Sequence, residues 1–238
     1  MGAKDAKIDF YKIIEKGSVT HDTSRFIFEL PHGARFDFLP GDHINVYLDK
    51  SDPLEFRPYT PTSTPDDSGH FELIIKHYQD GMVSKYMNGR GEGDDIAVSG
   101  PHAGRHFAEG MAGKVGMAAG GTGITPMIAM IRTILRRGLD VEISLLFANK
   151  SVDDIILKDE FDKYAAENRN FSRYYVVDKP PQGWDMGTGR INSDLMKEKL
   201  PAPSDETVIF LCGPPLMQLD LRKKLIELGH QKEKILIP

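Results

Sequence analysis

Apolar and polar positions alternate through the first hundred residues with the period of a β-strand. Phe26, Phe28 and Leu30 are each separated by one residue, a pattern typical of a strand with one buried face. Similar runs, bounded by clusters rich in proline, glycine and aspartate, occur at residues 43–48, 71–78 and 95–99. One short helix is predicted at residues 82–88. Short strands at regular spacing predict a small antiparallel β-barrel.

After residue 110 the pattern changes to continuous apolar runs separated by helical periodicity. The runs predict buried strands at residues 115–119, 141–147, 174–177 and 208–211. Helices are expected at residues 126–137, after a cap at Asp153, after a cap at Ser193, and at residues 214–228. This alternation of strand and helix predicts a doubly wound parallel sheet.

The two patterns together predict an α+β protein of two domains. We expect an antiparallel β-barrel domain in residues 1–110 and an α/β domain with a doubly wound parallel sheet in residues 111–238. The stretch from Gly110 to Gly113 is the expected hinge between them. A length of 238 residues suits two small domains.

Charge and composition exclude several classes of function. The net charge of −5 offers no electrostatic argument for binding nucleic acid. Glycines and a proline interrupt the longest uncharged run, residues 115–131, so no membrane span is expected. The first residues show no signal-peptide pattern, and Ala6 stands where a myristoylation motif requires Ser or Thr. We therefore expect a soluble cytoplasmic protein.

Cysteine and histidine usage disfavours a metal centre. Cys212 is the single cysteine, which excludes an intrachain disulfide and a four-cysteine metal site within the chain. His102 and His106 are four residues apart, but Gly104 lies between them and no carboxylate is nearby in the sequence. No metal site is predicted. Hydrolase chemistry has no support either, because neither a Ser-His-Asp order nor a zinc-protease motif occurs.

Two glycine–proline turns follow predicted strands of the second half. The run Gly-Gly-Thr-Gly-Ile-Thr-Pro at residues 120–126 allows close approach of a ligand to the backbone and leads into a helix N-terminus, which favours phosphate. It is not a full dinucleotide fingerprint, because Pro126 replaces the third glycine, and a tight structural turn is the alternative. The run Cys-Gly-Pro-Pro at residues 212–215 ends another strand, where ligands of parallel sheets bind. Cys212 alone also fits a small buried core residue.

A phosphate-binding pattern also occurs in the first half. Arg57 and Tyr59 would share one face of a strand, so a guanidinium could hold a phosphate while the ring lies against an aromatic cofactor. A surface arginine beside a core tyrosine is the alternative. Gly81 and Ser84 then begin the predicted short helix, as a second phosphate site or as an ordinary cap.

The order of these four motifs resembles the ferredoxin–NADP reductase superfamily, and within it the NADH–cytochrome b5 reductases and the flavin domain of nitrate reductase. The resemblance covers nearly the whole chain, including Leu-Leu-Phe-Ala-Asn at residues 145–149 and the segment around Trp184. It implies an FAD-binding barrel followed by an NADH-binding domain.

The resemblance also implies roles for individual residues. Arg57 and Ser84 would hold the FAD pyrophosphate, Tyr59 would lie against the flavin, and Lys76 would also face the NADH pyrophosphate. The other residues implied at the flavin are His43, Pro58, Thr60, Ile74, Tyr78, Gly81, Met82 and Val83. Those implied at NADH are Gly120, Gly121, Thr122, Thr125, Cys212, Gly213, Pro214, Pro215 and Met217. Thr60, Thr122 and Cys212 would lie nearest the hydride transfer.

Asp178 predicts a preference for NADH over NADPH. It follows the strand at residues 174–177, where a carboxylate can accept hydrogen bonds from the adenosine ribose and repel a phosphate on the same sugar. The matching position in cytochrome b5 reductases is also an aspartate. Against this, Lys179 is adjacent, and Asp178 could instead cap the following turn.

We therefore expect an FAD enzyme that takes a hydride from NADH and passes single electrons to a haem or iron–sulfur protein. Two departures from the family pattern leave the acceptor open: Met82 stands where a lysine is usual, and the chain ends in Pro238 where an aromatic residue is common. The alternatives are a ferric or flavin reductase, the reductase component of an oxygenase, and a flavin-binding regulatory electron-transfer subunit.

Overall fold

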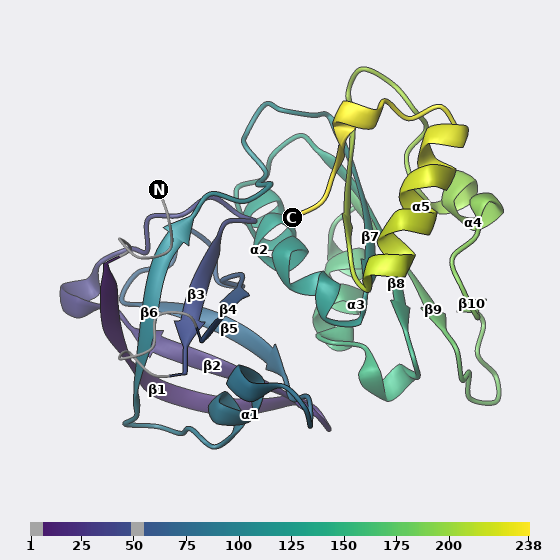
Figure 1. Cartoon of the computed structure of the whole chain (residues 1–238). Helices are drawn as coiled ribbons and strands as arrows, with labels where there is room; N and C mark the ends of the chain where they lie inside the picture. The colour runs from purple at the N-terminus through teal and green to yellow at the C-terminus, as the bar shows by residue number, and fades with distance from the viewer. Residues whose placement is uncertain (1–6, 49–54) are drawn as a thin grey trace. The chain divides into compact units, whose positions relative to one another are not determined.

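Two six-stranded sheets form the framework of the protein in a computed structural model that describes residues 7–48 and 55–238 (Figure 1). The described residues group into two units. The first falls within Met1–His106 and Ile128–Thr133, and the second comprises Phe107–Met127 and Ile134–Pro238. The start of the chain, where no signal-peptide pattern was found, lies outside the described residues.

The first unit is built on an antiparallel sheet with the strand order β4-β3-β6-β1-β2-β5. Its strands are β1 (Ile8–Thr20), β2 (Thr23–Glu29), β3 (His43–Tyr47), β4 (Phe56–Tyr59), β5 (His70–Lys76) and β6 (Asp95–His102). Helix α1 (Met82–Asn88) and a short 3-10 turn (Pro31–Gly33) complete it. The predicted antiparallel architecture is confirmed, as is the short helix.

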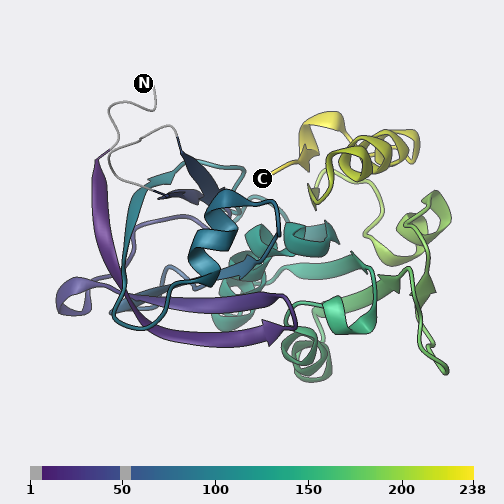
Figure 2. The ribbon, with the colours of Figure 1, turned by 60° about the horizontal axis from the view of Figure 1, so that its bottom comes forward.

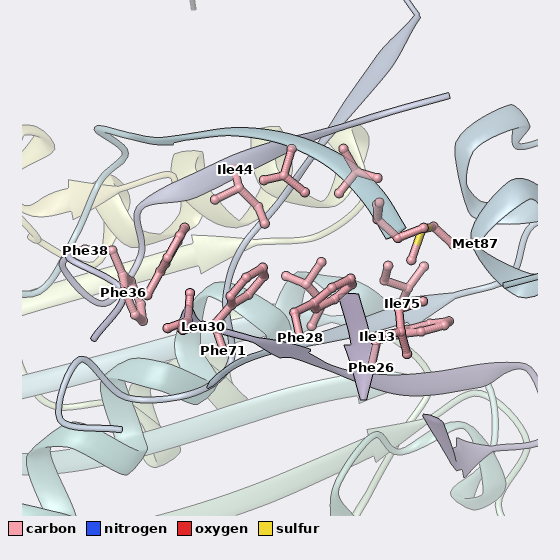
Figure 3. Packing of buried hydrophobic residues seen from close by; sticks show 14 of the residues in the cluster. Ile13, Phe26, Phe28, Leu30, Phe36, Phe38, Ile44, Phe71, Ile75 and Met87 are labelled. Carbon is pink, nitrogen blue, oxygen red and sulfur yellow. The ribbon is translucent and has the colours of Figure 1, made fainter. Parts of the chain in front are cut away.

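Aromatic side chains fill the hydrophobic core against this sheet, because every second residue of β2 and of β5 faces that core. Phe26 and Phe28 are fully buried, and Phe28 stacks on Phe71 with ring centroids 4.8 Å apart. Phe36 stacks on the other side of Phe71 at 4.6 Å (Figure 3). Each buried ring contributes about 1.5–3 kcal/mol by area, and each pair adds about 0.5–1.5 kcal/mol. This core gives the strands of the first unit a fixed position.

The second unit contains the predicted parallel sheet, with the strand order β10-β9-β8-β7-β11-β12. Its strands are β7 (Lys114–Gly120), β8 (Glu142–Asn149), β9 (Phe171–Val177), β10 (Gly187–Thr188), β11 (Thr207–Cys212) and β12 (Ile235–Leu236). Its helices are α2 (Thr125–Arg136), part of which groups with the first unit, α3 (Lys158–Glu167), α4 (Ser193–Lys199) and α5 (Pro215–Glu227), with 3-10 turns at Gly121–Ile124, Val152–Asp154 and Lys232–Lys234. β7 has β8 on one side and β11 on the other, so the strand order reverses at β7. Ligands of parallel sheets bind at such a point.

Helices cover both faces of the parallel sheet. Leu221 of α5 and Met196 of α4 pack with Leu146 of β8, and Figure 2 shows these two helices together on one side of the strands. On the other face, Tyr175 of β9 donates a hydrogen bond to Asp162 of α3 at 3.0 Å. Val176, the next residue of β9, belongs to the same buried cluster as Leu221 and Met196, so neighbouring residues of this strand face different helices.

Two predicted helix caps are wrong. The turn after β8 is capped by Ser151, which bonds to Asp154, and Asp153 does not cap a helix. Leu157 then adopts a left-handed conformation with φ of 55°, so α3 begins only after it. In α4 the cap is Asn192, whose side chain accepts the N–H of Leu195 at 2.9 Å, and not Ser193.

Within the described ranges, no helix is both long and apolar enough to cross a bilayer.

Candidate functional site

The two glycine–proline turns meet at the carboxyl ends of β7 and β11. Ala119 of β7 pairs in register with Cys212 of β11. A Cβ atom at Gly123 would overlap the carbonyl group of Cys212 and lie 2.6 Å from the nitrogen of Gly213. A Cβ atom at Gly120 would lie 3.0 Å from Cδ of Pro214. Glycine is therefore required where the backbones of the two turns touch.

The first of these turns leads directly into a helix N-terminus. Gly121 has φ of 53°, which favours glycine, and a 3-10 turn then carries the chain to α2 at Thr125. The hydroxyl of Thr125 donates to the carbonyl of Thr122 at 3.0 Å. The backbone N–H groups at the start of α2 form a site suited to an anion such as a phosphate.

Cys212 ends β11 beside this turn and is partly exposed. Burial raises the pKa of its thiol above the usual 9.0, although a hydrogen bond with the Gly213 backbone acts in the opposite direction. The thiol is thus neutral at physiological pH and poorly suited to nucleophilic attack. Its place at the strand end suits packing against a bound ring.

Asp178 lies on the same edge of the sheet, directly after β9. It is exposed, and its N–H donates to the carbonyl of Asn149 at 3.1 Å. Between the ends of β9 and β11 lie β8 and β7, so Asp178 and Cys212 are three strand spacings apart. At about 4.8 Å per spacing this is about 14 Å, a span suited to an extended dinucleotide.

On the other sheet, Arg57 and Tyr59 lie on β4, which is an end strand of the antiparallel sheet among the described strands. Arg57 is exposed, and its Nη1 donates to the carbonyl of Phe56 at 2.8 Å. The pKa of Tyr59 is raised to about 12, mainly by burial. The charge of Arg57 opposes this shift, and Tyr78 adds a smaller upward contribution. Tyr59 therefore stays neutral and offers a ring face near a guanidinium. Pro58 is exposed on this edge and Thr60 follows the strand.

The turn before α1 is held together by Ser84. This buried side chain donates to the carbonyl of Gly81 and accepts the N–H of Tyr78, both at 3.2 Å. A Cβ atom at Gly81 would lie 3.1 Å from Cβ of Tyr78 and would overlap the Ser84 hydroxyl. The phenol of Tyr78 also contributes to the raised pKa of Tyr59 on β4. Met82 is half exposed and Val83 is buried.

The remaining residues expected at the flavin occupy different environments. Ile74 is buried in the wall of β5, whereas Lys76, at its end, pairs with Asp22 at 2.7 Å. The ring of His43 lies 5.5 Å from that of His102, and burial, followed by the charge of His102, lowers the pKa of His43. His43 is therefore mainly neutral near pH 7.

Sequence reasoning missed a carboxylate beside His106. Asp42 precedes β3, and its Oδ1 lies 3.1 Å from Nδ1 of His106 and accepts the N–H of Gly104 at 3.0 Å. The two residues are 64 positions apart in the sequence. Only the fold brings them together, so no local pattern could have revealed the pair.

Two family models match the chain. The oxidoreductase FAD-binding domain matches residues 11–107, and the oxidoreductase NAD-binding domain matches residues 117–223. Together they cover most of both sheets, without β12.

Similar proteins agree with these matches. NADH-cytochrome b5 reductase 1 of Dictyostelium discoideum is 39% identical over 227 residues, which are 94% of this chain and 79% of the relative. The enzyme of the same name from Emericella nidulans is 40% identical over 229 residues, covering 92% of this chain and 74% of that protein. The crystal structure of the cytochrome b5 reductase domain of Ulva prolifera nitrate reductase superposes with a TM-score of 0.90 at 28% identity, covering 98% of this chain and 97% of that one. The chain therefore belongs to the NADH–cytochrome b5 reductase family of the ferredoxin–NADP reductase superfamily, and is an NADH-dependent flavin oxidoreductase.

Proposed function

We propose that this enzyme passes electrons from NADH, through FAD, singly to a haem protein of the cytochrome b5 type. The observation that carries the proposal is the joining of the two glycine turns at the ends of β7 and β11, which places Thr122 and Cys212 at one point of the sheet edge. Bound FAD accepts two electrons as a hydride and releases them one at a time. The acceptor is taken from the name of the relatives, NADH-cytochrome b5 reductase.

The residues of the first unit fit a flavin dinucleotide. The exposed guanidinium of Arg57 suits a pyrophosphate, and the neutral ring of Tyr59 suits the face of an isoalloxazine. Ser84 bonds to the Gly81 carbonyl and so holds the turn that begins α1, where backbone N–H groups suit a phosphate. We assign this role to residues 1–110 as the FAD domain. The other members of the proposed site are His43, Pro58, Thr60, Ile74, Lys76, Tyr78, Met82 and Val83.

The residues of the second unit fit NADH along the carboxyl edge of the parallel sheet. Asp178 would bind the adenosine ribose, the start of α2 would bind phosphate, and Thr122 with Cys212 would position the nicotinamide. We assign this role to residues 111–238. The other members of the proposed site are Gly120, Gly121, Thr125, Gly213, Pro214, Pro215 and Met217.

In these sites the protein itself performs no strong acid–base step. Tyr59 and the thiol of Cys212 both have raised pKa values, and His43 is mainly neutral near pH 7 because its pKa is lowered. Their work is to hold the two ring systems in place and to exclude water. Hydride transfer depends steeply on such positioning.

An acceptor comparison tests the proposal. The purified FAD enzyme is given NADH together with cytochrome b5, a ferric chelate, free flavin or a ferredoxin, and kcat/KM is measured for each. We expect the highest value for cytochrome b5. A higher value for the chelate or free flavin would identify a ferric or flavin reductase, and a higher value for the ferredoxin would identify an iron–sulfur acceptor.

The choice of nicotinamide cofactor tests the placement of NADH. Like-charge juxtaposition costs several kcal/mol, so we expect NADH to be favoured over NADPH by about a hundredfold in kcat/KM. Asp178→Ala should reduce this ratio mainly by improving the use of NADPH, while Lys179→Ala, the adjacent control, should not. Equal use of both cofactors by the unmodified enzyme would contradict the role of Asp178.

A cytoplasmic location is a separate proposal. The single cysteine agrees with a reducing compartment. Fractionation of cells that express the full-length protein would test it, and recovery in a membrane fraction would contradict it.

A further inference from the structure

Asn149, the last residue of β8, carries a buried side-chain amide with no hydrogen-bond partner. The residue is 8% exposed. Within the described ranges neither Nδ2 nor Oδ1 has a partner, and both atoms are shielded from solvent. Buried polar side-chain atoms in native proteins are nearly always paired, because leaving them unpaired costs free energy. Asn149 is the last residue of the run Leu-Leu-Phe-Ala-Asn at residues 145–149.

The position of Asn149 is central to the proposed path of NADH. β8 lies between β9 and β7, with Asn149 paired to Val177 and Ala148 paired to Gly120. The carbonyl of Asn149 accepts the N–H of Asp178 at 3.1 Å. A dinucleotide that runs from Asp178 to Cys212 must therefore cross the end of β8.

The local structure does not use this side chain. The turn that follows β8 is capped by Ser151, whose hydroxyl donates to Asp154 at 2.7 Å and whose N–H donates to the same carboxylate at 3.1 Å. The carbonyl of Asn149 is already bonded to Asp178. Asn170, by contrast, uses its Nδ2 to bond the carbonyl of Val141 at 2.9 Å, which is the ordinary structural role of a part-buried asparagine. Asn149 is thus open to a partner outside the chain.

The pairing capacity of the amide indicates which chemistry it would meet. Nδ2 offers two donors, and Oδ1 is an acceptor. Phosphate oxygens only accept, whereas a ribose hydroxyl also donates, so the segment joining the adenosine ribose to the pyrophosphate satisfies both ends. A purely anionic ligand would leave Oδ1 unpaired, and a hydrophobic ligand would leave both ends unpaired.

We propose that Asn149 is a dinucleotide-binding residue, whose Nδ2 donates to a phosphate oxygen of NADH and whose Oδ1 accepts from a ribose hydroxyl. The proposal rests on the placement of NADH given above. Because the amide is shielded from solvent in the free protein, a local shift at the end of β8 accompanies binding.

The test is Asn149→Leu, which keeps the approximate size of the side chain and removes its hydrogen-bonding groups. Titration of the FAD-loaded enzyme with NAD⁺ and with ADP-ribose should show both dissociation constants raised about tenfold, as expected for losing one or two hydrogen bonds. KM for NADH should rise while kcat changes little. The melting temperature without nucleotide should stay the same or increase, because two unpaired polar atoms are gone.

Two further variants separate a binding role from a structural one. Asn149→Asp keeps the shape, removes the donor and places a negative charge near the phosphates, so it should weaken ADP-ribose binding more than Asn149→Leu does. Asn170→Leu is the matched control, and it should lower the melting temperature without changing either dissociation constant.

A loss of melting temperature in Asn149→Leu with unchanged affinities would overturn the proposal and give Asn149 a structural role. Unchanged affinities with unchanged stability would overturn it as well. Asp178→Ala, measured in parallel, identifies the source of failure. If Asp178→Ala alters the NADPH preference and Asn149→Leu alters nothing, only the present proposal fails. If neither variant has an effect, the placement of NADH on this edge is wrong.

Discussion

The ion pair between Arg132 of α2 and Glu72 of β5 should be a large single contributor to the stability of the first unit. Nη1 of Arg132 donates to Oε1 of Glu72 at 2.7 Å and to the carbonyl of Thr62 at 2.8 Å. The Thr62 hydroxyl also donates to Oε1 of Glu72 at 2.8 Å. The side chains of Arg132 and Glu72 are only 17% and 9% exposed. Removing the arginine therefore leaves a buried carboxylate short of its nearest cation.

The structure sets the expected magnitude for Arg132→Ala. Breaking a buried pair costs about 3–5 kcal/mol. Nη1 of Arg25 remains 3.9 Å from the other carboxylate oxygen and the Thr62 hydrogen bond survives, which places the loss near the lower limit. A loss of about 3 kcal/mol corresponds to about 6–12 °C in a protein of this size, at about 2–4 °C per kcal/mol.

Thermal release of FAD provides the assay, because flavin fluorescence reports on the unit that we propose binds it. Lys224→Ala is the control, since Lys224 pairs with Asp220 four residues away on the surface of α5, where such a pair contributes under about 0.5 kcal/mol. The double variant Glu72→Leu with Arg132→Met removes both charges and should lose less than Arg132→Ala. If Arg132→Ala melts within a degree or so of Lys224→Ala, the pair is not a principal support of the first unit.

Three further predictions concern the cofactor sites and pH. Arg57→Ala should weaken FAD retention by about 1.5–3 kcal/mol, as for hydrogen bonds to a charged group, and unchanged FAD affinity would remove Arg57 from the pyrophosphate site. Cys212→Ala should slow flavin reduction by NADH on the order of a hundredfold in rapid mixing with FAD content unchanged, because about 1 Å of misplacement has that effect, and unchanged kinetics would reduce Cys212 to core packing. Burial lowers the pKa of His230 below 6.5, so its contribution to stability is complete above pH 6.5 and is lost as the pH falls below that value. His230→Gln should therefore flatten part of the decrease in melting temperature between pH 8 and 5.5, and an identical decrease in the variant would contradict this.

The regular strands were predictable because one physical rule governs them. Phe26 and Phe28 alternate since one face of β2 is buried, and the apolar runs of β7 and β11 are continuous since both faces of a parallel sheet are covered. β1 escaped this reasoning. Its pairing with β2 shifts register between Ile13 and Glu15 and again between Ser18 and Thr20, so the sequence alternation is broken although the strand runs through 13 residues.

Local rules failed where two of them competed. Ile155, Ile156 and Phe161 have helical spacing, which favours the helix predicted after a cap at Asp153. In the structure the left-handed Leu157 separates the two isoleucines from α3. The capping bonds of Ser151 fix where the turn begins, and hydrophobic spacing carries no information about them. The unpaired amide of Asn149 is equally invisible in sequence, because a missing hydrogen bond is a property of everything packed around the residue.

The glycine turn at residues 120–126 shows why its sequence left two interpretations open. From sequence, a structural turn and a nucleotide-binding turn are alternatives, but the fold makes the first a condition for the second. Gly123 must lack a side chain because the backbone of Cys212 and Gly213 occupies the space where its Cβ would lie. That contact joins segments about ninety residues apart in sequence and brings the ends of β7 and β11 to one point. A larger residue at 123 would therefore separate the two turns before it met any ligand, so the glycine needed for packing is also the one on which the proposed nicotinamide site depends.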